Sequence, residues 1–76
     1  MTRPLHVIAD EIRDDWGDPF FGAVPYLRAM ARLVNISDPY YSDTGTSIVA
    51  YFLANARTWR GPVAKRVKAE LKAMLK

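Results

Sequence analysis

The chain of 76 residues contains no cysteine and only one histidine, His6. The absence of cysteine excludes disulfide bonds, thiolate zinc sites, iron–sulfur clusters and cysteine nucleophiles. One histidine excludes every site that needs two imidazoles. The sequence also lacks the glycine-rich loops that hold nucleotides, the G-x-S-x-G turn of serine hydrolases and the H-E-x-x-H metal motif. We therefore expect no catalytic site, no metal site, no cofactor and no enzymatic activity.

Long apolar runs are also missing. No stretch approaches the roughly 20 apolar residues that span a membrane, and no basic segment leads into an apolar stretch as in a signal peptide. We therefore expect a cytoplasmic protein that does not contact a membrane. Half of the residues are hydrophobic and a quarter are charged, which is typical of globular proteins. The length is too small for a multidomain enzyme, so the sequence predicts one domain over residues 1–76.

Charge is divided unevenly along the chain. Residues 1–50 hold four basic and seven acidic side chains, whereas residues 51–76 hold seven basic and one acidic. A chain this small without disulfides has only a few kcal/mol of stability, and oligomerisation is one remedy. One hypothesis is therefore a homo-oligomer in which the acidic face of the first helix meets the basic last helix of a neighbour.

Proline and glycine divide the chain into segments whose apolar residues recur at spacings of three and four, which is typical of amphipathic helices. The pattern predicts four helices, at about 4–16, 23–34, 44–57 and 62–75, with a loop at 36–42 and Asp43 as an N-cap. No charged residue occurs between positions 44 and 56, so this helix is expected at the centre. The predicted fold is all-α, a compact single domain resembling a four-helix bundle with its third helix central.

The last predicted helix carries a stripe of four lysines at spacings of three, four and four, namely Lys65, Lys68, Lys72 and Lys76. Lysines contact phosphates without reading bases, so the stripe would give weak binding of nucleic acid without sequence preference. The alternative is a solvated helix face whose positive charges complement the negative end of the helix dipole. Because the second alternative is more common, nucleic-acid binding is the less favoured function.

Nine aromatic residues are concentrated near the connections between helices. Phe20–Phe21 and Tyr40–Tyr41 are adjacent pairs, and neighbouring residues in an extended segment point to opposite sides. One ring of each pair is therefore expected at the surface. Trp59 lies between two arginines at the end of the uncharged helix, and tryptophan and arginine often dominate protein interfaces. These observations select candidates for protein interaction, namely Arg57, Trp59, Arg60, Tyr40 and Tyr41. The alternative is that Trp59 is buried.

Three polar features have structural interpretations that we favour. Asn55 falls within the apolar arc of the third helix, and we expect its amide to bond the backbone of the 36–42 loop or of the 59–61 turn. His6 and Asp10 are four residues apart, which is more typical of a surface pair than of a catalytic dyad. The aspartates at 14, 15 and 18 lack the spacing of a calcium loop and are expected to be solvated.

Several segments resemble a known family: residues 47–72, the opening residues 3–9, and residues 21–27. The most specific part is Tyr-Phe-Leu-x-Asn-x-x-Thr-Trp-Arg-Gly at 51–61. Together these segments cover most of the chain and resemble small uncharacterised proteins encoded by actinobacterial phages, chiefly mycobacteriophages, and by their prophages. The resemblance implies an accessory protein made inside a bacterial host. It transfers no functional site, because the family has no established activity.

The function that we predict from these features is non-enzymatic binding of a host or phage protein in the host cytoplasm. The alternative is weak, sequence-nonspecific nucleic-acid binding through the basic C-terminal helix.

Overall fold

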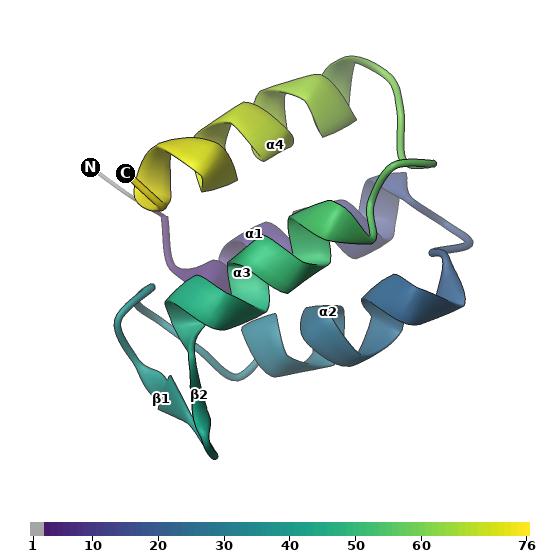
Figure 1. Ribbon diagram of the computed structural model, residues 1–76. Helices are drawn as coiled ribbons and strands as arrows, with labels where there is room; N and C mark the ends of the chain where they lie inside the picture. The colour runs from purple at the N-terminus through teal and green to yellow at the C-terminus, as the bar shows by residue number, and fades with distance from the viewer. Residues whose placement is uncertain (1–2) are drawn as a thin grey trace.

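The computed structural model describes residues 3–76, and its regular elements are mostly helical (Figure 1). Within these residues the elements follow in the order α1 (Leu5–Asp15), the single 3-10 turn η1 (Phe21–Ala23), α2 (Val24–Met30), β1 (Pro39–Tyr40), β2 (Asp43–Thr44), α3 (Gly45–Ala54) and α4 (Pro62–Met74). The described part of the chain is therefore a compact, mainly helical globule with one small antiparallel hairpin. None of these helices is long and apolar enough to cross a bilayer.

The spatial order of the helices differs from their order along the chain. α1 packs against both α2 and α4, whereas the main neighbour of α3 is α2 (Figure 1). The hairpin of β1 and β2 projects from one end of this arrangement, next to the start of α3. A four-helix bundle with the third helix at its centre is a finer description than these contacts establish, and it stays a prediction.

The core contains only apolar side chains. Every buried side chain of residues 3–76 is hydrophobic, and all four helices contribute. Three aromatic rings meet within it: Trp16 stacks on Trp59 with centroids 5.8 Å apart, and Phe52 packs edge to face with both indoles at centroid distances of 6.4 Å. The predicted apolar face of the first helix is confirmed, because it is buried in this core. Its members are Leu5, Ile8, Ala9, Ile12 and Trp16.

The second helix is shorter than predicted, because α2 ends at Met30 rather than near Val34. The backbone beyond it bends so that the carbonyls of Leu33 and Val34 accept hydrogen bonds from the N–H groups of His6 and Leu5, each at 2.9 Å. These N–H groups belong to the first turn of α1, where backbone donors have no acceptor within the helix. Because the carbonyls of Leu33 and Val34 accept these hydrogen bonds, α2 ends early and Val34 is half exposed.

The segment before α3 also differs from the prediction. Residues 36–42 do not form a plain loop, because Pro39–Tyr40 pairs with Asp43–Thr44 in a short hairpin. Asp43 is therefore not the N-cap; Thr44 takes this role, and its hydroxyl accepts from the N–H of Ser47 at 3.5 Å. Position 45 requires glycine, because a Cβ there would lie 2.5 Å from the carbonyl oxygen of Ile36, too close for any side chain.

Candidate functional site

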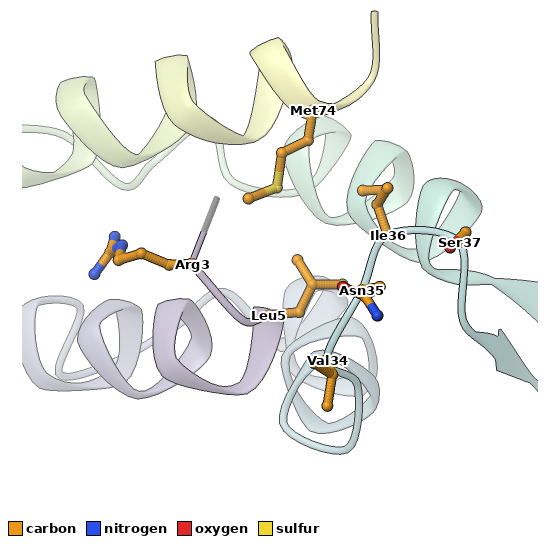
Figure 2. A pocket seen from close by; sticks show the side chains of 7 residues that line it. All are labelled: Arg3, Leu5, Val34, Asn35, Ile36, Ser37 and Met74. Atoms are coloured by element: carbon orange, nitrogen blue, oxygen red, sulfur yellow. The ribbon is translucent and has the colours of Figure 1, made fainter. Parts of the chain in front are cut away.

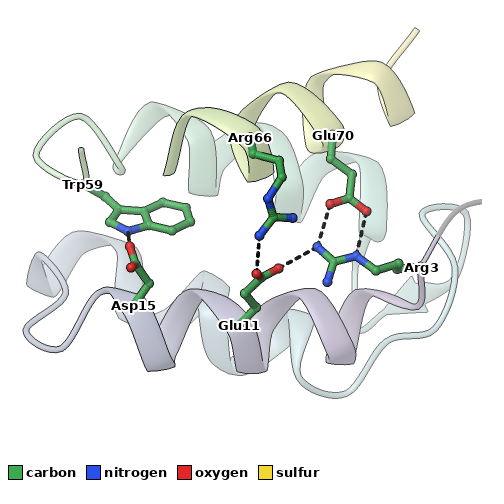
Figure 3. A network of polar contacts seen from close by, with 6 residues as sticks. All are labelled: Arg3, Glu11, Asp15, Trp59, Arg66 and Glu70. Atoms are coloured by element: carbon green, nitrogen blue, oxygen red, sulfur yellow. Dashed lines mark hydrogen bonds and ion pairs between the residues drawn. The ribbon is translucent and has the colours of Figure 1, made fainter. Parts of the chain in front are cut away.

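Trp59 is a core residue rather than part of an exposed patch. Its side chain is 2% exposed, and its ring stacks on Trp16. Its indole N–H donates to Asp15 Oδ2 at 2.9 Å (Figure 3). The proposed patch of Trp59 with Arg57 and Arg60 is therefore wrong in its central member. The tryptophan closes the α1–α4 end of the core, and the two arginines that flank it in sequence remain exposed.

A different aromatic surface lies beside Arg57. Phe20, Ala54, Asn55, Arg57 and Thr58 line a cavity of about 290 Å³ between the segment before η1 and the end of α3. The ring of Phe21, which is 82% exposed, contacts that of Phe20 at a centroid distance of 4.7 Å. Tyr51, 53% exposed, lies one helical turn before Asn55 and stacks on Tyr26. We call the set Phe20, Phe21, Tyr51, Ala54, Asn55, Arg57 and Thr58 the Phe20 surface.

Gly22 and Asn55 shape the wall of this cavity. A Cβ at Gly22 would lie 2.7 Å from the ring of Phe20 and 2.8 Å from Asn55 Oδ1, so glycine permits the close approach of these two side chains. The amide of Asn55 donates to the carbonyl of Tyr51 at 2.9 Å, in its own helix. The expected partners of Asn55, in the 36–42 loop or the 59–61 turn, are therefore wrong, and the residue ends α3 as its C-cap.

The two tyrosines selected from the sequence lie at the hairpin. Tyr41 is 87% exposed, whereas Tyr40 is half-buried against the core, and the two rings meet edge to face at 4.8 Å. The prediction that one ring of each aromatic pair reaches the surface is confirmed for Tyr40–Tyr41, whereas in Phe20–Phe21 both rings are exposed, Phe20 at 42% and Phe21 at 82%. Tyr41 has a φ of 55°, the left-handed region that a bulky side chain seldom adopts.

The four lysines of the basic stripe do not lie in equivalent surroundings. Lys65, Lys72 and Lys76 are exposed, but Lys68 is half-buried and donates to the carbonyl of Trp59 at 2.6 Å. Its ammonium also lies 5.8 Å from the centroid of the Trp59 ring. Burial, and then the positive charges of Lys72 and Arg60, lower the pKa of Lys68. The stripe therefore combines three solvated charges with one that the fold holds in place.

An ion network links α1 and α4 (Figure 3). Arg3 donates to both carboxylate oxygens of Glu70, at 2.6 and 2.9 Å, and its Nη2 lies 2.8 Å from Glu11 Oε1. Arg66 donates to the other oxygen of Glu11. The acidic first helix and the basic last helix thus meet within one chain. The pairing of Arg66 with Glu70 that their i, i+4 spacing favours is absent from the ion pairs of residues 3–76.

This network predicts a loss of stability in acid. Arg66, and then Arg3, hold the pKa of Glu11 below its usual value of 4.5, and Arg3 does the same for Glu70. Because both folded-state pKa values are lowered, the stabilisation is complete above pH 4.5 and is lost as the pH falls further. Urea unfolding at neutral pH and at about pH 3 should show this loss, and Glu70→Gln should reduce it. Asp10→Asn, an exposed change on α1 outside the network, is the control; an equal reduction there would contradict the assignment.

A second cavity, of about 240 Å³, opens between the start of α1, the 34–37 segment and the end of α4 (Figure 2). Leu5 and Met74 approach it from opposite elements, while the guanidinium of Arg3 extends toward the ion network. Among residues 3–76, Arg3 is the only charged side chain that lines the cavity, and its partners are Glu70 and Glu11. The described residues that line this cavity therefore supply no free charged group for catalysis or for binding an ion.

The remaining polar candidates stay apart from one another. His6 and Asp10 are exposed, and no bond joins them among the hydrogen bonds and ion pairs of residues 3–76. Asp15 is the acceptor for the indole N–H of Trp59. The part of the chain that the structure describes holds no group of three or more acidic or histidine side chains that could share a metal ion.

No family model, curated protein or solved structure matches the chain. The candidate site therefore depends on this chain's own geometry, which places the cavity beside Phe20 next to the exposed ring of Phe21.

Proposed function

We propose that the protein is a non-enzymatic, phage-encoded accessory protein that binds a host or phage protein in the host cytoplasm. Docking occurs through the Phe20 surface. The observation that carries this proposal is the cavity of about 290 Å³ between Phe20 and Arg57, bordered by a phenylalanine that is 82% exposed. The same proposal takes α3 as the central helix, since it contributes Phe52 to the core and Tyr51 to the docking surface.

The chemistry of the surface suits a protein partner. Aromatic side chains and arginine are enriched at the centres of protein interfaces, and an exposed phenylalanine can gain contacts there that it lacks in water. Arg57 is exposed, and no carboxylate of residues 3–76 lies within 4.0 Å of its guanidinium. Its charge is therefore free to pair with an acidic side chain of the partner, beside an apolar group inserted next to Phe20.

Two matched substitutions test this proposal. Phe21→Ser and Tyr41→Ser each remove a ring that is more than four-fifths exposed, so neither should change folding. The wild-type chain and each variant serve in turn as bait in host lysate. The Phe21→Ser bait should capture at least tenfold less of the protein that the wild type binds, because removal of a central interface residue typically costs about 2 kcal/mol or more of binding free energy. Tyr41→Ser should leave capture unchanged.

Reduced capture by Tyr41→Ser with unchanged capture by Phe21→Ser would show that the hairpin is the docking element and that the Phe20 surface is not. Equal capture by all three chains would contradict both surfaces. A thermal melt of each variant, monitored by circular dichroism, checks that a loss of binding is not a loss of folding.

The alternative function is weak, sequence-nonspecific nucleic-acid binding through α4. Its specific support is that Lys65, Lys72 and Lys76 are exposed, with no carboxylate of residues 3–76 within 4.0 Å. Each phosphate contact contributes about 0.9 to the slope of log K against log salt on duplex DNA. Lys65→Gln with Lys72→Gln should therefore lower that slope by about 2. Absence of binding at low salt would exclude this function.

Self-association through the acidic face of α1 and the basic face of α4 is less well supported than the sequence indicated. Glu11 and Arg66, which would meet between molecules, pair within one chain. Gel filtration of the purified protein measures the oligomeric state directly.

A further inference from the structure

We propose that the cavity between Trp59 and Lys68 binds a phosphate group that carries more than one negative charge. This cavity, of about 410 Å³, is lined by the turn before α4 and by the first two turns of that helix. Three cationic side chains contribute to its lining: Arg60, Lys65 and Lys68. The inference is separate from the Phe20 surface, and it rests on the nucleic-acid proposal only where a nucleic acid supplies the phosphate.

None of the three cations forms an ion pair with a carboxylate of residues 3–76. Every ion pair of residues 3–76 belongs to the network of Arg3, Glu11, Arg66 and Glu70, so no carboxylate lies within 4.0 Å of the cavity cations. The nearby Asp15 accepts the indole N–H of Trp59. An excess of positive charge around one cavity attracts a multivalent anion more strongly than a single carboxylate.

Lys68 is held in place before any ligand arrives. Its ammonium donates to the carbonyl of Trp59 at 2.6 Å, and its side chain is half-buried. An ammonium has three N–H donors, so this bond leaves two for a phosphate oxygen. A positioned donor loses less conformational entropy on binding than a free lysine does.

The electrostatics of Lys68 agree with this geometry. Burial, and then the positive charges of Lys72 and Arg60, lower the pKa of Lys68, so Arg60 and Lys68, which both line the cavity, repel each other. An anion among them would reverse that repulsion. The lining of the cavity also includes Trp59, Pro62 and Ala64, whose apolar surfaces limit competing hydration. Arg60 and Lys65, which also line the cavity, are exposed and can turn toward a bound phosphate.

The test uses the full chain labelled for NMR and titrated with inorganic pyrophosphate at low salt. Amide shifts should concentrate in residues 59–68. Arg60→Gln and Lys65→Gln should each weaken binding about tenfold, the factor expected for loss of one charge-assisted contact. Lys76→Gln is the matched control, because it removes one charge from the same stripe outside the cavity, and it should leave the dissociation constant unchanged.

Two results would overturn the site: absence of shifts with pyrophosphate, or equal weakening by Lys76→Gln, which would indicate only general attraction to a basic helix.

Parallel titrations distinguish the source of the phosphate. If oligo-dT competes with pyrophosphate, the site accepts a nucleic-acid backbone. If pyrophosphate binds and oligo-dT does not, the site holds and the nucleic-acid proposal fails. If oligo-dT shifts α4 without displacing pyrophosphate, nucleic-acid binding holds at a different surface and the backbone is excluded as a ligand of the cavity.

Discussion

Trp59→Ala is expected to leave the domain largely unfolded. Truncation of a buried tryptophan typically costs about 3–5 kcal/mol, and a chain of 76 residues without disulfides has about that much stability in total. Trp59 has three further interactions to lose: the stacking on Trp16, the indole hydrogen bond to Asp15, and the contact of its ring with Lys68.

Tyr51→Ala is the control for this prediction, because it removes an aromatic ring that is 53% exposed and should keep a cooperative melt near that of the wild type. Fluorescence gives a second readout. In a Trp16→Phe variant, Trp59 is the only tryptophan, and its emission should be blue-shifted and resistant to quenching by iodide. Red-shifted emission that iodide quenches would mean that Trp59 is solvated and that the core described above is wrong.

Phe52→Ala is expected to have an effect of similar size, about 3–5 kcal/mol. The side chain is fully buried, and its ring packs edge to face with both Trp16 and Trp59 at centroid distances of 6.4 Å. Phe52→Leu, which keeps most of the apolar volume, should cost less than about 1.5 kcal/mol and remain folded. Thermal melts monitored by circular dichroism distinguish the two variants. A cooperative Phe52→Ala melt within a few degrees of the wild type would show that α3 does not supply the core.

The helices could be predicted because local signals mark them. Pro62 begins α4 at a position where its missing N–H costs nothing, and the spacing of apolar residues identifies the buried face of each helix. The end of α2 could not be predicted in this way. It depends on hydrogen bonds from Leu5 and His6, which are distant in sequence and become neighbours only after folding.

The candidate site was only partly visible in the sequence. Arg57 and the exposure of rings in the two aromatic pairs follow from composition and spacing, but the exposure of both Phe20 and Phe21 and the burial of Trp59 do not. Its flanking arginines suggest a surface position, whereas its ring stacks on Trp16, 43 positions earlier in the chain. The same limit applies to the ion network, in which Arg66 pairs with Glu11 of α1 rather than with its local neighbour Glu70. Local spacing identifies side chains that can meet, and tertiary packing decides which pairs form.

The central claim, that the Phe20 surface docks a protein, is tested most directly by site-specific photo-crosslinking in host cells. A benzophenone-bearing amino acid replaces Phe21 in one chain and Tyr41 in another, two positions of similar exposure on separate segments. The account predicts one discrete crosslinked product from position 21, which is lost when Arg57→Glu reverses the charge beside the cavity, and no such product from position 41. No product from position 21, or the same mixture of products from both positions, would contradict it.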